Sequence, residues 1–148
     1  MALCEAAAYY KSKGITLCEQ MQNLYQKYGF YKESLFFQTF QGMEGKAKID
    51  GLMDALRNEP PKQVGPFKVT ALEDYKKSVR TDIATGETSA LTLPESNVLY
   101  FELEDGAWFC VRPSGTEPKI KYYAGVKGAD AQDAEDKLEA LSKAVVEL

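Results

Sequence analysis

The residues best suited to bind a ligand form one polar stretch near the end of the chain. It reads Arg112-Pro113-Ser114-Gly115-Thr116-Glu117-Pro118-Lys119. Arg112 brings a planar guanidinium that matches two phosphate oxygens at once, and Lys119 adds a more mobile positive charge. The two prolines fix φ at about −65° and so restrict the shape of the stretch. This combination predicts a preshaped loop that binds an anion.

The centre of the same stretch adds small groups that bind phosphate without charge. Ser114 and Thr116 offer hydroxyls, and the backbone amides of residues 114–117 can converge on one anion as a nest. Gly115 permits a turn, or a close ligand approach, that a Cβ atom would obstruct. The spacing matches neither a Walker loop nor a dinucleotide-binding fingerprint. From these residues alone, a phosphate cradle and a plain connecting turn with Arg112 paired to a surface carboxylate both stay open.

Two strand-like runs precede the loop and must hold Arg112 in place. They are residues 97–103 and 107–111, and the Asp105-Gly106 pair between them predicts a two-residue type I′ hairpin. This turn sets three cross-strand pairs: Leu103 with Trp108, Phe101 with Cys110, and Leu99 with Arg112. One face then carries a core layer of Leu99, Phe101, Leu103, Trp108 and Cys110. In this register Arg112 stands where the core layer ends, and a third strand, residues 119–124, follows the loop.

The remaining chain alternates helical and strand patterns. We expect helices at residues 1–13, 17–28, 44–58 and 131–148, and strands at 34–40 and 64–75. Thr16 and Glu19 form a capping box ahead of the second helix, and Asp130 caps the last helix. Residues 76–96 are polar and turn-rich, which predicts a long loop. The last helix is expected to bury a stripe of Ala131, Ala134, Leu138, Leu141, Val145 and Leu148.

This order of elements predicts the α+β class, with a mostly antiparallel sheet and helices packed on one face. We place the domain at residues 34–148 and a short helical segment at residues 1–33. An aromatic cluster around the first strand is expected to serve core or interdomain packing, because no basic residues accompany it as a nucleic-acid platform would require. The cluster consists of Phe30, Tyr31, Phe36, Phe37 and Phe40.

Composition argues against several classes of function. The formal charge of −4 argues against broad binding of nucleic acid or anionic membranes. No apolar run approaches the ~20 residues of a membrane span, and we expect no signal peptide. The chain has no histidine, which removes Ser-His and Cys-His catalysis and histidine metal sites. Cys4, Cys18 and Cys110 lack metal-ligand spacing, so we expect reduced packing cysteines and a cytoplasmic location.

The loop resembles the phosphate-binding loop in the last domain of α-D-phosphohexomutases, most closely the phosphoglucomutase and phosphomannomutase branch. A loop of the form Arg-x-Ser-Gly-Thr-Glu-Pro-Lys-Ile-Lys-Tyr-Tyr is typical there, and this sequence has the same residue types from Arg112 to Tyr123. The likeness covers most of the chain, including Tyr28-Gly29-Phe30-Tyr31. It implies a TATA-binding-protein-like fold for residues 34–148 and makes residues 1–33 the end of a third domain.

The resemblance also implies a function. In that family a phosphoserine on the first domain exchanges its phosphoryl group with a phosphosugar, Mg²⁺ on the second domain assists, and the third domain grips the sugar. The last domain holds the phosphate that is not reacting. The carried-over binding residues are Arg112, Ser114, Gly115 and Thr116, with Lys119 adding to the field and Glu117 orienting Arg112 or Lys119.

The nucleophile and metal loops of the family are not visible in this sequence. We therefore expect a segment that binds no cofactor and is inactive alone, with Mg²⁺ held by another domain of the parent enzyme. Its expected partners are a phosphosugar, such as glucose 1-phosphate or glucose 6-phosphate, and the remaining domains of the parent chain. The alternatives are a stand-alone phospholigand-binding or regulatory module, and an interaction domain whose loop is only a turn. A nucleic-acid role ranks below both on charge.

Overall fold

The computed structural model describes residues 1–40 and 44–148. It begins with helices α1 (Ala2–Ser12) and α2 (Leu17–Tyr28), strand β1 (Phe30–Thr39) and helix α3 (Glu44–Asn58). The next strands are β2 (Gln63–Val64), β3 (Phe67–Asp74), β4 (Val79–Asp82), β5 (Thr88–Ala90), β6 (Leu99–Leu103) and β7 (Trp108–Pro113). One 3-10 turn, η1 (Glu104–Gly106), joins β6 to β7. Strand β8 (Lys119–Gly128) and helix α4 (Ala131–Val146) follow.

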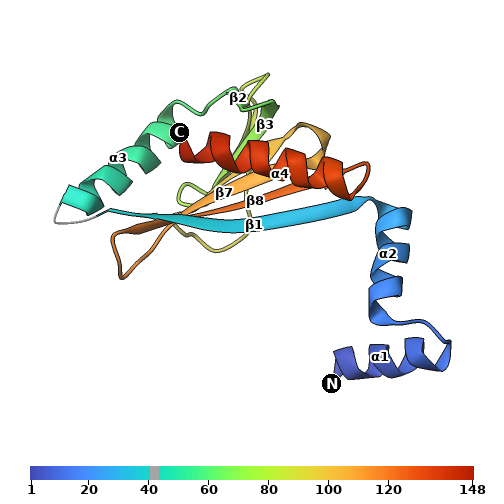
Figure 1. Ribbon diagram of the computed structural model, residues 1–148. Coiled ribbons are helices and arrows are strands. Elements are labelled where there is room, and N and C mark those ends of the chain that lie inside the picture. Colours follow the sequence, from blue (N-terminus) through green and yellow to red (C-terminus); the bar gives the residue numbers. More distant parts are fainter. Residues whose placement is uncertain (41–43) are drawn as a thin grey trace.

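The strands form one antiparallel sheet. Its order is β1-β8-β7-β6-β3-β4-β5, and β2 pairs with β3 beside this path. Helices α3 and α4 lie over one face of the sheet, and α4 packs mainly on β8 and β1 (Figure 1). The predicted α+β class, with an antiparallel sheet and helices on one face, is therefore confirmed.

The core lies between the sheet and these two helices. The sheet contributes fully buried Phe101, Phe109 and Ile120, and the rings of Phe101 and Phe109 stack with centroids 4.4 Å apart. Helix α3 adds Met53, and α4 adds Leu141, each from an apolar stripe at helical spacing. Since alternate residues of a strand point to opposite faces, the same strands leave their other side chains on the face without helices.

Helices α1 and α2 project away from this body (Figure 1), and none of their residues is buried. The predicted capping box is confirmed: the Thr16 hydroxyl accepts from the Glu19 amide at 3.1 Å, and the Glu19 carboxylate accepts from the Thr16 amide at 2.7 Å. Cys4 and Cys18 are exposed on these helices, so the prediction that they are packing residues is wrong.

Strand β1 begins at Phe30 rather than at residue 34, and β8 runs to Gly128 rather than to residue 124. The two strands pair over ten positions, from Phe30 with Gly128 to Thr39 with Lys119. The aromatic cluster divides by face. Phe36 and Phe40 pack against the core, whereas Tyr31 and Phe37 are exposed.

The predicted long loop at residues 76–96 contains two short strands. Strand β4 pairs with β3, and β5 pairs with β4. Ser78 has a φ of 53°, a left-handed conformation that a turn requires and that β propensity does not reveal. The prediction of a loop was wrong because these strands extend a sheet edge with mostly polar residues, half-exposed in β4 and exposed in β5, and so lack an apolar pattern.

The hairpin between β6 and β7 differs from the prediction by one residue. Residues 104–106 form its turn, and the Leu103 amide donates to the Ala107 carbonyl at 2.9 Å. The observed pairs are Glu102 with Trp108, Phe101 with Phe109, Tyr100 with Cys110, and Leu99 with Val111. A shift of one residue moves every side chain of a strand to the other face. The predicted core layer was therefore wrong for Trp108 and Cys110, and Phe109 and Val111 take their place.

The last helix begins as predicted, with the Asp130 carboxylate accepting from the Asp133 amide at 2.8 Å. Four of the six predicted stripe residues are buried: Ala134, Leu138, Leu141 and Val145. Ala131 and Leu148 are exposed, because the first lies at the start of the helix and the second beyond its end.

Candidate functional site

Residues 114–118 connect β7 to β8 at one end of the sheet. The loop is closed at its base by the Ser114 amide, which donates to the Lys119 carbonyl at 2.8 Å. The Lys119 amide donates to the Glu117 carbonyl at 2.7 Å, and the Phe40 amide donates to the Pro118 carbonyl at 2.8 Å. The loop is thus fixed both to its own strands and to the end of β1.

One side of the loop lines a cleft of about 520 Å³. Ser114, Gly115 and Thr116 all belong to this lining. An ideal Cβ on Gly115 would meet no atom within 4 Å, and its φ lies outside the left-handed region. Gly115 is therefore not required by a strained backbone. Because Gly115 has no side chain, it leaves open space beside the backbone that a ligand can occupy.

The backbone amides of the loop are only partly available for an anion. Of the four that the sequence suggested, the Ser114 amide is occupied by the Lys119 carbonyl. The amides of residues 115–117 donate no hydrogen bond to any residue that the structure describes. An anion nest can therefore use three amides, not four.

The basic side chains lie on the other side of the loop. Arg112 pairs with Lys121 across β7 and β8, on the same face as Cys110 and away from the helices. It is exposed and makes no ion pair within the described part of the chain. The Lys119 ammonium lies 4.7 Å from the centroid of the Phe37 ring, on that same face. Neither Arg112 nor Lys119 lines the cleft.

Glu117 contacts one of the two cations that it was predicted to orient. Its Oε2 lies 3.0 Å from Nζ of Lys119, and its side chain is mostly exposed. The structure thus brings the predicted site residues together in one loop but divides them by face. Ser114, Gly115, Thr116 and Glu117 line the cleft, and the two cations lie on the face of the sheet that no helix covers.

The cleft has a second wall that the sequence analysis did not assign. It is formed by Lys46, Ile49 and Asp50 of α3, together with Asn97 just before β6. In the sequence, Lys46 and Asp50 fall on the polar side of a helical pattern, which is the usual signature of a solvated face. Asn97 sits at the start of a strand run. No pattern in the sequence marks these residues as part of a site. They are recognised only from the folded structure, because the loop and α3 are distant in sequence.

Several titrating groups lie elsewhere on the sheet. Burial raises the pKa of the Cys110 thiol to about 11, an effect that the nearby Arg112 partly offsets. A hydrogen bond to Glu73 at 2.6 Å, with partial burial, raises the pKa of Tyr75 to about 12. Both groups are therefore neutral near pH 7, and neither lines the cleft.

The described residues gather no group of three or more His, Cys, Asp or Glu side chains that could hold a metal ion. The residues of the loop are cationic or neutral apart from Glu117, so they suit an anion rather than a divalent cation. The helices in residues 1–40 and 44–148 include none long and apolar enough to cross a bilayer.

Comparison with known proteins places this loop in a family. Residues 52–143, which include the loop, match the family described as phosphoglucomutase/phosphomannomutase, C-terminal domain. A phosphoglucomutase of Staphylococcus aureus is 38% identical over 135 residues, which is 91% of this chain and 24% of the relative. One of Staphylococcus epidermidis is 38% identical over 120 residues, or 81% of this chain and 22% of the relative. The chain thus spans about a quarter of the length of these relatives.

A solved structure, the open form of the phosphoglucomutase parafusin from Paramecium, overlaps 88% of this chain and 21% of its own chain. The TM-score is 0.48 at 15% sequence identity, and this overlap carries no conclusion about function. The match over residues 52–143 covers more than half of the chain and includes the whole loop. On that ground this chain belongs to the C-terminal domain family of phosphoglucomutases and phosphomannomutases.

Proposed function

We propose that the loop at residues 112–119 binds the non-reacting phosphate of a phosphosugar during intramolecular phosphoryl transfer by a phosphoglucomutase or phosphomannomutase. Glucose 1-phosphate and glucose 6-phosphate are examples of such ligands. The observation that carries the proposal is the set of unused donors around Gly115: three backbone amides and two hydroxyls beside open space. The family match, which includes this loop, supports the same assignment.

In this proposal Arg112 and Lys119 supply the positive charge that attracts the phosphate. Arg112 stands in β7, whose pairing with β6 and β8 fixes its backbone beside the loop, and its exposed side chain is free to turn toward a bound phosphate. The Lys119 ammonium forms an ion pair with the Glu117 carboxylate, and this ion pair keeps the ammonium close to the loop when no ligand is bound. Charge-assisted hydrogen bonds from these groups to phosphate are stronger than neutral ones.

The chain alone is proposed to be inactive, because the nucleophilic serine loop and the metal loop of the family belong to other domains. Mg²⁺ would serve the parent enzyme from one of those domains. The phosphosugar and the other domains of the parent chain are the proposed partners. A cytoplasmic location remains a prediction.

Phosphate binding by this chain should be weak. A charge-assisted bond contributes about 1.5–3 kcal/mol. Association costs at least ~4 kcal/mol of translational and rotational freedom. Two or three such bonds then leave about 2–4 kcal/mol, which corresponds to a dissociation constant near or above ~1 mM. Because the sugar-reading residues belong to other domains, the affinity should depend little on the sugar.

The test is an NMR titration with inorganic phosphate, glucose 1-phosphate and glucose 6-phosphate. We expect the amides of residues 112–119 to shift at millimolar ligand with little sugar preference, and Arg112→Ala to abolish the shifts. Lys62→Ala, which removes an exposed cation beyond the C-terminal end of α3, is the matched control and should change nothing. Micromolar binding of one sugar phosphate would instead favour a stand-alone module, and measurable turnover would contradict the proposed inactivity.

A further inference from the structure

The wall of the cleft that faces the loop carries its own hydrogen-bond donors. Lys46 comes from the first turns of α3, and Asn97 comes from the segment before β6. Lys46 makes no ion pair with any residue that the structure describes, although Asp50 lies four positions further along the same helix. The cleft thus lies between a loop with unused donors on one side and an uncompensated ammonium with an amide on the other.

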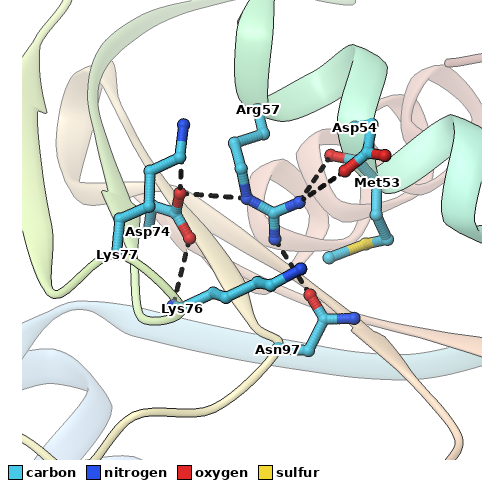
Figure 2. Close-up of polar contacts among 7 residues, drawn as sticks. All are labelled: Met53, Asp54, Arg57, Asp74, Lys76, Lys77 and Asn97. Carbon is cyan, nitrogen blue, oxygen red and sulfur yellow. Dashed lines mark hydrogen bonds and ion pairs between the residues drawn. The ribbon is translucent and has the colours of Figure 1, made fainter.

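Asn97 is held by a buried ion pair. The Arg57 Nη2 donates to Oδ1 of Asn97 at 2.9 Å, and Nε of Arg57 donates to Oδ2 of Asp74 at 3.0 Å. The side chains of Arg57 and Asp74 are only 5% and 6% exposed. Oδ1 of Asp74 also accepts from the Lys76 amide at 3.1 Å. Figure 2 shows this chain of contacts from α3 to the segment before β6.

This ion pair decides which end of the Asn97 amide faces outward. A guanidinium has only donors, so the group that Asn97 turns toward Arg57 must be its oxygen. The Nδ2 group then points away from Arg57 (Figure 2) and donates no hydrogen bond to a described residue. Asn97 is therefore fixed as a hydrogen-bond donor, the role that phosphate oxygens require. An asparagine without such a partner could turn either end of its amide outward, whereas the hydrogen bond from Arg57 sets the orientation of this one.

We propose that Lys46 and Asn97 are binding residues for the same phosphate that the loop takes, contacting it from the opposite wall of the cleft. Lys46 supplies positive charge and Nδ2 of Asn97 donates a hydrogen bond. Arg57 and Asp74 are positioning residues that keep the Asn97 amide in its donating orientation. This inference rests on the proposed function, since it assumes phosphate at the loop. Asp50 on this wall and Glu117 on the loop also line the cleft, and their negative charges oppose an anion and lower its affinity.

The decisive variant is Asn97→Asp. It keeps an oxygen for Arg57, so the fold and the buried contacts are preserved, but it replaces the outward donor by a carboxylate oxygen. Titrated with inorganic phosphate, it should bind about 10- to 100-fold more weakly than the unaltered chain. Lys46→Ala should weaken binding by about 2- to 5-fold, and Asp50→Asn should tighten it by a similar factor. Lys62→Ala again serves as the unaffected control.

A second readout follows Asn97 directly. In the unaltered chain, the side-chain NH₂ signal of Asn97 should shift with phosphate along the same saturation curve as the amides of residues 114–117. Arg57→Lys retains a cation for Asp74 but loses the second guanidinium donor, which bonds Oδ1 of Asn97. It should therefore weaken phosphate binding. In an Asn97→Ala background the same Arg57→Lys change should have no further effect on affinity. A merely structural role for Arg57 would weaken binding equally in both backgrounds.

The outcomes separate this inference from the proposed function. If phosphate shifts the loop amides of the unaltered chain, and Asn97→Asp and Lys46→Ala bind it with unchanged affinity, the second wall is not part of the site and the loop assignment stands. If phosphate leaves the loop amides of the unaltered chain unmoved, both the loop assignment and the second wall are wrong. Loss of binding in Asn97→Asp, together with tightening in Asp50→Asn, is the expected result.

Discussion

The two faces of the sheet are built from the same strands but differ in what covers them. On the face under α3 and α4, Phe101, Phe109 and Ile120 are 0% exposed. On the other face, Leu35 and Phe37 of β1 are 58% and 60% exposed, although they are equally apolar. Hydrophobicity therefore does not decide which side chains form the core. The register of the strands does, because it selects the face to which each side chain points.

The loop between β7 and β8 is divided between the same two faces. Strand β7 carries Arg112 on the uncovered face, whereas Ser114 and Thr116 turn toward the cleft beside α3. A ligand that uses both sets of groups must sit at the end of the sheet, where the two faces meet. The loop is thus placed where the covered face of the sheet and the open face meet.

The largest difference between the faces should appear in stability. Phe101→Ala removes a fully buried ring that stacks on Phe109, and it should lower the free energy of unfolding by about 3–5 kcal/mol. Phe37→Ala removes a mostly exposed ring and should cost less than about 1 kcal/mol. Urea unfolding followed by circular dichroism measures both values. Equal losses would mean that the two faces do not differ as described.

Cys110 tests whether the uncovered face is wholly open. Its thiol is partly buried there, and its pKa is raised from 9.0 to about 11 by that burial. At pH 8 its thiolate fraction should be about 100-fold lower than that of a thiol with a pKa of 9.0. The measurement is the rate of alkylation against pH in a Cys4→Ser, Cys18→Ser chain, which leaves one reactive group. The rate should keep rising toward pH 11, and a rate that is half-maximal near pH 9 and level above pH 10 would show that burial does not raise the pKa of Cys110.

The smallest effect concerns an ion pair on the same uncovered face. Arg80 donates to both carboxylate oxygens of Glu102, at 2.9 Å and 2.8 Å, and each side chain is 34% exposed. This hydrogen bonding lowers the pKa of Glu102 below 4.5. The stability that the pair contributes is therefore present above about pH 4.5 and is lost as the pH falls through the lower pKa of the folded state.

Because the pair is about one-third exposed, Glu102→Gln should cost less than about 1 kcal/mol at pH 7. Below the folded-state pKa of Glu102 the difference between the two proteins should vanish. Unfolding curves of both proteins from pH 7 to pH 3 measure it. A difference that grows as the pH falls would contradict the assignment.

What the sequence predicted correctly was local. The capping box of Thr16 and Glu19 and the cap at Asp130 depend on residues three positions apart, and both occur as expected. The family of the chain was recognised because the residues of the loop form one continuous motif, while their role in binding stays a prediction. The α+β class followed from the sequence of helical and strand patterns along the chain.

What the sequence could not predict depended on single residues or on distant contacts. The Asp105-Gly106 pair does turn the chain with positive φ, but Glu104 joins the turn, and this one residue moved Trp108, Cys110 and Arg112 to the uncovered face. The second wall of the cleft was missed for a different reason. Asn97 gains its fixed orientation from Arg57, forty positions earlier in the chain, and only the packing of α3 on the sheet brings them together.

Strand β1 also sets the distance between two parts of the molecule. It begins directly after Gly29 at the end of α2, runs for ten residues along β8, and is followed by Phe40, whose amide is bonded to Pro118 of the loop. At about 3.3 Å per residue it spans about 33 Å between the N-terminal helices and the loop at residues 114–118. The Tyr25 ring of α2 stacks on the Phe30 ring at the start of this strand, with centroids 5.3 Å apart, so α2 contacts one end of the strand and the loop contacts the other. Ten paired residues thus separate the N-terminal helices from the loop, and the backbone pairing with β8 runs along the whole of that distance.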